Sequence, residues 1–174
     1  MRVVLIGTSG SGKSTLAQRL GKLYGAAVLH LDAVHFLPGW VERPVEEERE
    51  IVGRFLDEHD SWVIDGSYGD VCFERRLEEA DRILVLWFNR FVCLRRVVSR
   101  WLRNRGRSRD SMAVGCEEKM DAGFVWWVLH EGRTASKRKA FLGIGERYPG
   151  KLVWIGNRRQ LDAYLASIGD GATQ

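Results

Sequence analysis

A glycine-rich run near the start of the chain combines the residue types that bind phosphate. Gly7-Thr8-Ser9-Gly10-Ser11-Gly12-Lys13-Ser14 fits the pattern G-x-x-x-x-G-K-[ST]. Glycines let backbone N–H groups turn inward around phosphate oxygens, and a helix that follows adds the partial positive charge of its N-terminus. Lys13 would reach the β- and γ-phosphates, and the Ser14 hydroxyl would bind Mg²⁺. The alternative is a glycine-rich turn that binds nothing. The residues expected to hold a nucleoside triphosphate are Gly7, Ser9, Gly10, Ser11, Gly12, Lys13, Ser14 and Thr15.

A second feature is the local concentration of arginine between Arg90 and Arg109. This stretch holds eight arginines and no acidic residue. Without these eight, the 27 basic residues fall to 19 against 23 acidic residues, so the rest of the chain is net −4. Such a local cluster favours an anionic ligand over a general nucleic-acid surface, and the planar guanidinium suits phosphate. A solvated helix face and a bias in base composition are the plainer alternatives.

The spacing within this arginine-rich stretch predicts one helix with two different faces. Its expected apolar face consists of Phe91, Leu94, Val98 and Trp101. Its arginine stripe, at i, i+4, i+7 and i+11, consists of Arg96, Arg100, Arg103 and Arg107. Residues 104–109 follow with a glycine and no periodicity, which is typical of a loop.

The elements that must position these residues alternate between short apolar runs and amphipathic helical stretches. Runs so short and so apolar are typical of parallel strands buried on both faces. A helix over Thr15–Tyr24 directly follows the glycine-rich run. The pattern predicts an α/β fold of three layers, with a five-stranded parallel sheet and helices on both faces. The expected strands are Val3–Ile6, Ala27–Leu31, Trp62–Ile64, Ile83–Trp87 and Leu152–Ile155.

Length and composition indicate a single globular domain over residues 1–174. Hydrophobic residues make up 45% and charged residues 29% of the chain, which argues against disordered and membrane-embedded classes. No apolar run approaches the ~20 residues that span a bilayer, so we expect a cytoplasmic protein without a membrane partner. The three cysteines have neither CxxC spacing nor paired histidines nearby, so no disulfide framework or zinc site is expected.

With Trp62-Val63-Ile64-Asp65-Gly66 added to the glycine-rich run, the chain resembles the nucleoside monophosphate kinase-like P-loop family, which includes adenylate and shikimate kinases. More narrowly, it resembles the adenylate kinase-related bacterial group called DNA topology modulation proteins. The resemblance covers nearly the whole chain and implies a helical lid. The motifs that carry it are Gly7–Thr15, Leu31-Asp32, Pro38-Gly39-Trp40, Trp62–Tyr68, Arg76 with Ala80-Asp81, the arginine helix and Cys116-Glu117.

Two aspartates acquire roles from this resemblance. Asp65 resembles the carboxylate that holds Mg²⁺ through water; a helix-capping aspartate is the alternative. Asp32 is expected to end the second strand, at the sheet edge where α/β folds bind ligands. The family's phosphoryl acceptor faces this region, so Asp32 would orient or deprotonate an acceptor hydroxyl. An ordinary loop aspartate is the alternative.

The arginines match the region where the family has its lid. Arg96 and Arg100 correspond to a pair just before the lid, of which one lies near the nucleotide base and the other contacts phosphate. A lid over about 101–122 would close over the γ-phosphate and supply donors that stabilise charge in the transition state. Later arginines expected in or near it are Arg103, Arg105, Arg107 and Arg109. The catalytic residues expected are Lys13, Asp32, Arg96, Arg100 and Arg103.

A flap over about 33–60 is expected to bind the acceptor. Its candidate contacts are His35, Trp40, Arg43, Arg49 and Arg54, and Arg76 is a further candidate for an acceptor phosphate. The other histidines, His30, His59 and His130, are expected to be structural or on the surface. The chain departs from the narrower family where Leu86-Trp87-Phe88-Asn89-Arg90 replaces a Leu-Asp-x-Pro-Arg-like run. Trp87 is therefore expected to pack rather than to bind a ligand.

The leading functional hypothesis is an ATP- and Mg²⁺-dependent phosphotransferase. Its acceptor would be a nucleotide, a nucleoside or a hydroxylated metabolite. The alternatives are a P-loop ATPase with a nucleic-acid-binding or regulatory role, and an ATP hydrolase without an acceptor. A small-molecule acceptor is the expected partner, nucleic acid is not favoured, and the expected state is a monomer or weak homodimer.

Overall fold

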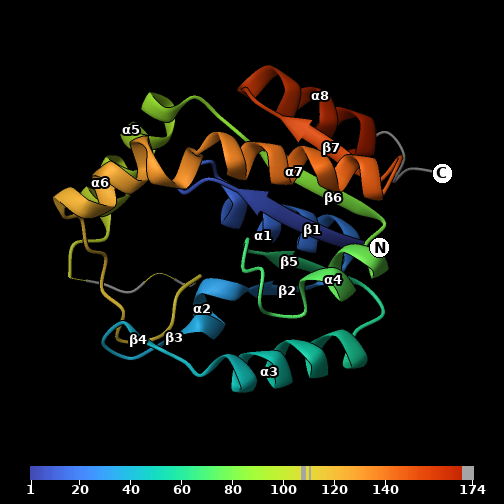
Figure 1. The fold of residues 1–174 in the computed structure, drawn as a ribbon, viewed down its shortest axis with the longest axis horizontal. Coiled ribbons are helices and arrows are strands. Elements are labelled where there is room, and N and C mark those ends of the chain that lie inside the picture. The colour runs from blue at the N-terminus through green and yellow to red at the C-terminus, as the bar shows by residue number, and fades with distance from the viewer. Residues whose placement is uncertain (107–108, 110, 170–174) are drawn as a thin grey trace.

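The computed structural model describes residues 1–106, 109 and 111–169 (Figure 1). Arg107, which belongs to the predicted arginine stripe, and residues 108, 110 and 170–174 lie outside these ranges. The strands are β1 (Arg2–Gly7), β2 (Ala27–His30), β3 (Phe36–Leu37), β4 (Val41–Glu42), β5 (Trp62–Asp65), β6 (Arg82–Leu86) and β7 (Leu152–Ile155). The helices are α1 (Lys13–Tyr24), α2 (Leu31–His35), α3 (Val45–Glu58), α4 (Phe73–Glu79), α5 (Arg90–Arg103), α6 (Ala122–Leu129), the 3₁₀ turn η1 (Glu131–Arg133), α7 (Ala135–Arg147) and α8 (Arg158–Gly169).

The predicted five-stranded sheet is confirmed. Its order is β2-β5-β1-β6-β7, and each neighbouring pair is parallel. The expected strand boundaries agree with the observed ones to within a residue. Because all five strands run the same way, their carboxyl ends meet at one edge, where the register sets His30 beside Asp65. The glycine-rich run leaves the central strand β1 at this same edge.

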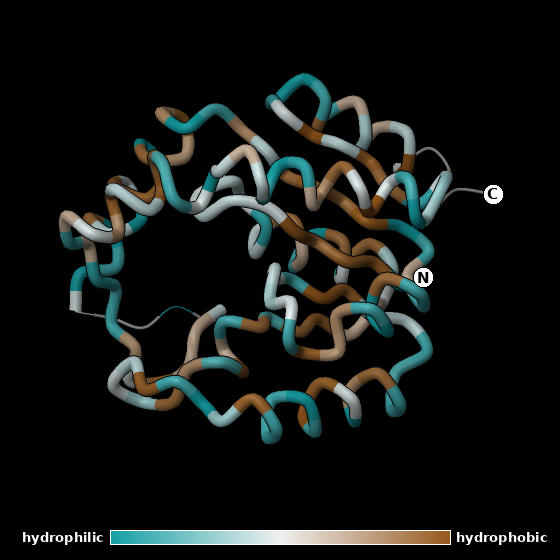
Figure 2. Tube along the Cα trace, in the orientation of Figure 1, coloured by the Kyte–Doolittle hydropathy of each residue, from teal (hydrophilic) through white to brown (hydrophobic). Residues whose placement is uncertain are grey.

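Alternate residues of each strand face opposite layers, which produces the predicted three-layer arrangement. Val3 and Leu5 pack with α1, α5, α6 and α8 on one face. Val4 and Ile6 pack with α2, α3, α4 and α7 on the other. Figure 2 shows the resulting hydrophobic band along the strands between helices with hydrophilic outer faces. Among the residues described, no helix combines the length and the apolar character needed to cross a membrane.

The segment between β2 and β5 contains more elements than the sequence indicates. It comprises α2, the hairpin β3-β4 and α3, so the expected flap is built from a short helix, a hairpin and a longer helix. The prediction that Asp32 ends the second strand is wrong: β2 ends at His30, and Asp32 lies in the first turn of α2. The side chain still sits at the carboxyl edge of the sheet, one short turn further along.

The expected apolar face of α5 is not the face that the helix buries most deeply, although its Leu94 packs against the core. The residues that α5 buries are Cys93 and Val97, whereas 69% of Phe91 is exposed. The helix turns Cys93 and Val97 toward the glycine-rich turn, and the stripe that includes Phe91 and Leu102 faces outward. The periodicity predicts the helix correctly. The close contact with the glycine-rich turn is made by Cys93 and Val97 and not by the larger apolar residues.

Backbone crowding around the glycine-rich turn explains two of its glycines. Gly7 has φ +139°, and a Cβ there would collide with the Leu86 carbonyl. Gly10 has φ +74°, and a Cβ there would lie 2.5 Å from the Cys93 carbonyl oxygen and 2.9 Å from Val97 Cγ2. The turn is therefore wedged between β6 and α5, and only residues without a side chain fit at these two points.

We expect Gly10→Ala to lower the free energy of unfolding by about 1–3 kcal/mol, because it adds both left-handed backbone strain and overpacking against α5. Urea denaturation measures this change. Gly53→Ala is the matched control: it lies inside α3 with no atom near the added Cβ, so it should stabilise by about 0.5–1 kcal/mol. Equal effects of the two substitutions would contradict the wedged geometry.

Candidate functional site

The glycine-rich turn, residues 7–14, is called the phosphate-binding turn from here on. It leads directly into α1 at the edge of the sheet. Gly12 is the N-cap of α1 in the left-handed conformation, and Lys13 is the first helical residue. Lys13 Nζ donates to the carbonyl oxygens of Thr8, at 3.1 Å, and Gly7, at 3.3 Å. The ammonium group thus lies over the turn, where it would meet phosphate oxygens, and the free N–H groups at the start of α1 open toward the same space.

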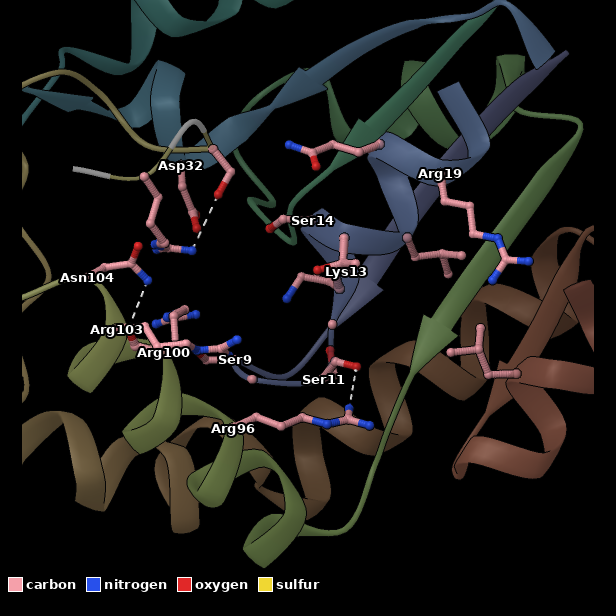
Figure 3. A pocket seen from close by; sticks show the side chains of 18 of the residues that line it. Ser9, Ser11, Lys13, Ser14, Arg19, Asp32, Arg96, Arg100, Arg103 and Asn104 are labelled. Carbon is pink, nitrogen blue, oxygen red and sulfur yellow. Dashed lines mark hydrogen bonds between the residues drawn. The ribbon is translucent and has the colours of Figure 1, made fainter. Parts of the chain in front are cut away.

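A cavity of about 690 Å³ lies between this turn and the arginine helix α5. Figure 3 shows Lys13 and Ser14 on one side and Arg100 and Arg103 on the other. Arg19 lines it too, but Figure 3 places its guanidinium on the far side of α1. The sequence-predicted residues that line it are Ser9, Gly10, Ser11, Gly12, Lys13, Ser14, Thr15, Asp32, Arg96, Arg100 and Arg103. Residues that sequence reasoning did not connect with it include Asn104, Ser111, Arg158 and Leu161.

Asp65 sits at the end of β5, only 5% exposed. Burial tends to raise its pKa, but the hydrogen bond with His30, the charge of Lys13 and the hydrogen bond with Ser14 together lower the pKa below the ordinary carboxyl value. His30 Nδ1 lies 3.1 Å from Asp65 Oδ2. Asp65 is therefore held as a carboxylate next to Ser14. His30 is no surface residue, and the signal available in the sequence was its place at the end of the neighbouring parallel strand.

Asp32 lies on the cavity wall and is bonded to a residue from the loop after β5. Tyr68 donates its hydroxyl hydrogen to Asp32 Oδ1 at 2.8 Å. Burial, and then the negative charge of Asp32, raise the pKa of Tyr68, so it stays a hydrogen-bond donor. This leaves the rest of the Asp32 carboxylate available to a ligand in the cavity.

The two arginines expected just before the lid make different contacts. Arg96 donates to the Ser11 carbonyl oxygen at 3.0 Å and lies over the Phe88 ring at 4.6 Å, so it supports the phosphate-binding turn from outside. Arg100 points across the cavity, and burial lowers its pKa. Arg103 lines the cavity while donating to the Ser99 carbonyl oxygen at 3.2 Å. The three residues of the arginine stripe that the structure describes therefore all line the cavity.

Glu118 supplies the counter-charge that the arginine-rich stretch itself lacks. Its carboxylate is 4% exposed and lies 3.0 Å from Arg100 Nε. Arg109 forms a second ion pair with the same carboxylate oxygen. One buried acid therefore holds two cavity arginines, one from α5 and one from the segment after it. Sequence reasoning noted the neighbouring Cys116-Glu117 and passed over Glu118, because nothing in local spacing links it to Arg100.

Arg133, in η1, reaches the phosphate-binding turn from the other end of the chain. Its Nη2 lies 2.8 Å from Thr8 Oγ1 and 3.0 Å from Cys93 Sγ. Burial lowers the pKa of this guanidinium. Thr8 and Cys93 are themselves buried, so Arg133 ties the turn to α5. No motif in the sequence indicates this contact, because Arg133 lies 125 positions from Thr8 and 40 from Cys93.

The expected lid region, about 101–122, comprises the end of α5, a non-helical segment in the residues described, and the start of α6. This segment contacts the hairpin β3-β4. Trp40 Nε1 donates to the Glu117 carbonyl oxygen at 3.0 Å, and Gly39 N donates to the Gly115 carbonyl oxygen at 3.2 Å. Trp40 therefore holds the lid to the flap.

Two more predictions about single residues can be judged from contacts. Arg76 as a ligand of an acceptor phosphate is wrong: it is fully buried and donates to the carbonyl oxygens of Val71, Gly66 and Tyr68. The expected packing role of Trp87 is confirmed, because its ring meets those of Phe141 and Trp154 at 5.9 and 5.8 Å.

The residues present fit a magnesium ion bound together with a nucleotide. Mg²⁺ is bound through one or two protein oxygens, with water and substrate phosphates completing its shell. The Ser14 hydroxyl and the ionised Asp65 carboxylate are such oxygens beside the phosphate-binding turn. No group of three or more acidic, histidine or cysteine side chains that would hold a metal alone occurs among the described residues. A site shared with substrate is what this donor set favours.

The order of the parallel strands and the turn between β1 and α1 define a P-loop protein. Residues 3–118 match the family described as an AAA domain, so the chain belongs to that family. A search of curated proteins found no significant match.

Solved structures show where else this fold occurs. Shikimate kinase from Bacteroides thetaiotaomicron is 18% identical, with a TM-score of 0.56, over 98% of this chain and 97% of that one. Deoxyadenosine kinase from M. mycoides with bound dATP is 13% identical, with a TM-score of 0.54, over 97% and 100%. The same enzyme with dCMP and a flexible dCDP is 14% identical, with a TM-score of 0.52, over 98% and 100%. The fold is thus that of P-loop small-molecule kinases.

We expect Glu118→Gln to loosen the lid. Removing one partner of a buried ion pair costs about 3 kcal/mol, and here it leaves two guanidinium groups without their shared anion. Amide hydrogens around residues 115–119 should exchange about a hundredfold faster in the variant. The control is Glu117→Gln, whose exposed side chain is the immediate neighbour. Equal exchange in the two variants would show that Glu118 does not hold the lid.

Asp65 should make stability depend on pH in the acid range. Its pKa is lowered in the folded protein, so the unfolded chain binds the proton more tightly. The stabilising contribution is complete above the ordinary carboxyl pKa of about 4, and it is lost as the pH falls through the folded value. Urea denaturation should show the difference in unfolding free energy between the parent and Asp65→Asn shrinking as the pH falls from about 5 to about 2. These limits lie about one to two units either side of the ordinary carboxyl pKa. The exposed Asp60→Asn should show no such trend.

Proposed function

We propose that the protein transfers the γ-phosphoryl group of ATP, with Mg²⁺, to a small hydroxylated acceptor. The observation that carries this proposal is the meeting of three kinds of group in one cavity: Lys13 and Ser14 of the phosphate-binding turn, the arginines of α5, and the Asp32 carboxylate. The fold shared with shikimate kinase and deoxyadenosine kinase supports it. Those names leave a nucleotide, a nucleoside or another metabolite as acceptor classes.

The phosphate end of the cavity is built to bind negative charge. Lys13 would bind the β- and γ-phosphates, and amides of the turn would bind the remaining oxygens. Arg100 and Arg103 approach from the opposite side, where charge on the transferring group develops. Magnesium held by Ser14 and, through water, by Asp65 would neutralise further phosphate charge. Arg96 positions the turn through Ser11.

Asp32 is the residue placed to act on the acceptor. Phosphoryl transfer needs an acceptor oxygen in line with the bond to the leaving phosphate. The free part of the Asp32 carboxylate would orient the acceptor hydroxyl and take its proton. The contact of Trp40 with the segment after α5 would keep water from the cavity while both ligands are bound.

The alternative of a nucleic-acid-binding ATPase has less support from the geometry. Among the clustered arginines that the structure describes, four line the cavity, so these four are not available as a continuous outer surface. These four are Arg96, Arg100, Arg103 and Arg109. The resemblance to DNA topology modulation proteins, the monomer or weak homodimer and the cytoplasmic location stay predictions.

The proposal is tested by ADP release from ATP in the presence of single candidate acceptors. One acceptor should raise the rate well above the hydrolytic background. Lys13→Ala should lower kcat/KM on the order of 100- to 1000-fold, because a principal phosphate donor is lost. Asp32→Asn should lower the acceptor-dependent rate on the order of 100- to 10,000-fold while ATP binding, measured by calorimetry, stays within about twofold.

Matched controls separate these effects from misfolding. Lys22→Ala removes an exposed lysine from the last turn of the same helix as Lys13, and Asp60→Asn removes an exposed carboxylate at the amino end of β5. Both should retain the parent rate. ADP release at one constant rate, whatever compound is added, would identify a hydrolase and contradict the proposed transfer.

A further inference from the structure

The segment 33–79, all of which the structure describes, begins directly after Asp32, the cavity residue that the proposed function places at the acceptor. This stretch contains five arginines and no lysine. A phosphate group on the acceptor would need a cation free to face it, since an unpaired buried phosphate is costly. Of the arginines that line the cavity with Asp32, Arg100 and Arg109 are already paired with Glu118. The partners of the five arginines therefore bear on the class of acceptor.

Two of the three arginines of the flap are held by contacts within the protein. Arg43 Nε donates to the Val34 carbonyl oxygen at 2.8 Å, and its Nη1 lies 3.4 Å from Glu47. Arg49 Nε donates to the Asp70 carbonyl oxygen at 2.7 Å. Both guanidinium groups thus serve to fasten the flap.

The other three are placed away from the cavity. Arg75 lies 2.6 Å from both Asp57 and Glu79. Arg76 is fully buried among carbonyl oxygens. Arg54 is exposed and lies two residues from each of the buried positions 52 and 56, which puts it on the outer side of α3.

Carboxylates gather where these cations are missing. Tyr68 bonds to Asp32, and after burial and Asp32 the charges of Glu48 and Asp65 also raise its pKa. Glu48 is 3% exposed and lies 2.9 Å from His35 Nδ1. Three carboxylates therefore act on Tyr68, and Arg100, the cation that interacts with Asp32, is paired with Glu118. Such a field opposes a second phosphate and favours donors such as hydroxyl groups.

Aromatic rings of the flap pack next to Tyr68, the hydrogen-bond partner of Asp32. The ring of His35 lies 4.6 Å from that of Tyr68 and 4.6 Å from that of Phe36. Phe36 in turn meets Trp40 at 5.1 Å. Flat apolar rings beside hydrogen-bond acceptors suit a flat base attached to a hydroxylated sugar.

Resting on the proposed function, we propose that the acceptor is a neutral nucleoside rather than a nucleotide. The base packs against the aromatic rings of the flap, and one sugar hydroxyl lies at Asp32. In the transfer, the acceptor oxygen forms a bond to the γ-phosphorus as the bond from that phosphorus to the bridging β–γ oxygen breaks. The hydroxyl proton passes to the Asp32 carboxylate. The products are a nucleoside monophosphate and ADP.

The test measures ADP release with matched pairs: adenosine and AMP, deoxyadenosine and dAMP, cytidine and CMP, uridine and UMP, thymidine and dTMP. At least one nucleoside should raise the rate, and its own monophosphate should be poorer in kcat/KM by about tenfold or more, since it brings an unpaired charge to a negative region. Shikimate, which is hydroxylated and anionic, should be as poor as the monophosphates.

The outcomes separate the inference from the proposed function. A monophosphate that outperforms its nucleoside, or a preference for shikimate, overturns the neutral acceptor and leaves phosphoryl transfer standing. A Lys13-dependent release of ADP that no compound accelerates overturns both. Product analysis by ³¹P NMR should show a phosphate ester on the nucleoside and no free phosphate beyond the background.

Two substitutions test whether a flap arginine is released to bind phosphate. Arg43→Ala and Arg49→Ala should leave the preference for nucleoside over monophosphate within about twofold of the parent, because neither guanidinium faces the acceptor. The exposed Arg54→Ala is the control. If Arg43→Ala or Arg49→Ala abolishes activity with a monophosphate and spares activity with its nucleoside, the arginine binds phosphate and the inference is wrong.

Discussion

Contact between backbone atoms, at two places where no side chain fits, fixes the phosphate-binding turn. Gly7 lies against the Leu86 carbonyl and Gly10 against the Cys93 carbonyl, so β6 and α5 press on the turn from two sides. The position of this turn also sets the positions of Lys13, Ser14 and the first amides of α1, which come directly after it. The same contact brings α5 close enough for Arg96 to reach Ser11. The remaining arginines enter the cavity because α5 is anchored there.

The cavity is polarised by where its charges originate. Lys13 and the α5 arginines make one part positive, and Asp32, Glu48 and Asp65 make the acceptor side negative. Phosphoryl transfer uses such a division, since the donor carries all the phosphate charge at first and the acceptor must lose a proton. The cations come from α1 and α5, whereas the carboxylates come from α2, α3 and the end of β5.

The sequence predicts the parts of this site that depend on local order and leaves out those that depend on distant contacts. The strand, turn and helix around Lys13, the parallel sheet and Asp65 follow from short motifs and hydrophobic runs. The buried face of α5 does not, because its tight packing on Gly10 selects Cys93 and Val97 over larger apolar residues. Glu118 and Arg133 were missed for a related reason: each meets its partners through tertiary contact alone. Arg76 belongs to one of the motifs that carry the family resemblance. It is nevertheless fully buried, and it donates hydrogen bonds to carbonyl oxygens of the loop after β5.

Under the proposed function, the ion pairs of Glu118 make ligand binding an exchange of anions. A triphosphate that engages Arg100 and Arg109 takes them from a carboxylate already in place, so its binding energy is a difference between two pairings. The number of arginines that line the cavity therefore overestimates the affinity for a triphosphate. Because Glu118 is part of the chain, its carboxylate loses little translational entropy when it pairs with an arginine. Singly charged ions in solution therefore compete poorly with it. Polyanions gain from the exchange and simple salts do not, which gives selectivity before any base or sugar is recognised.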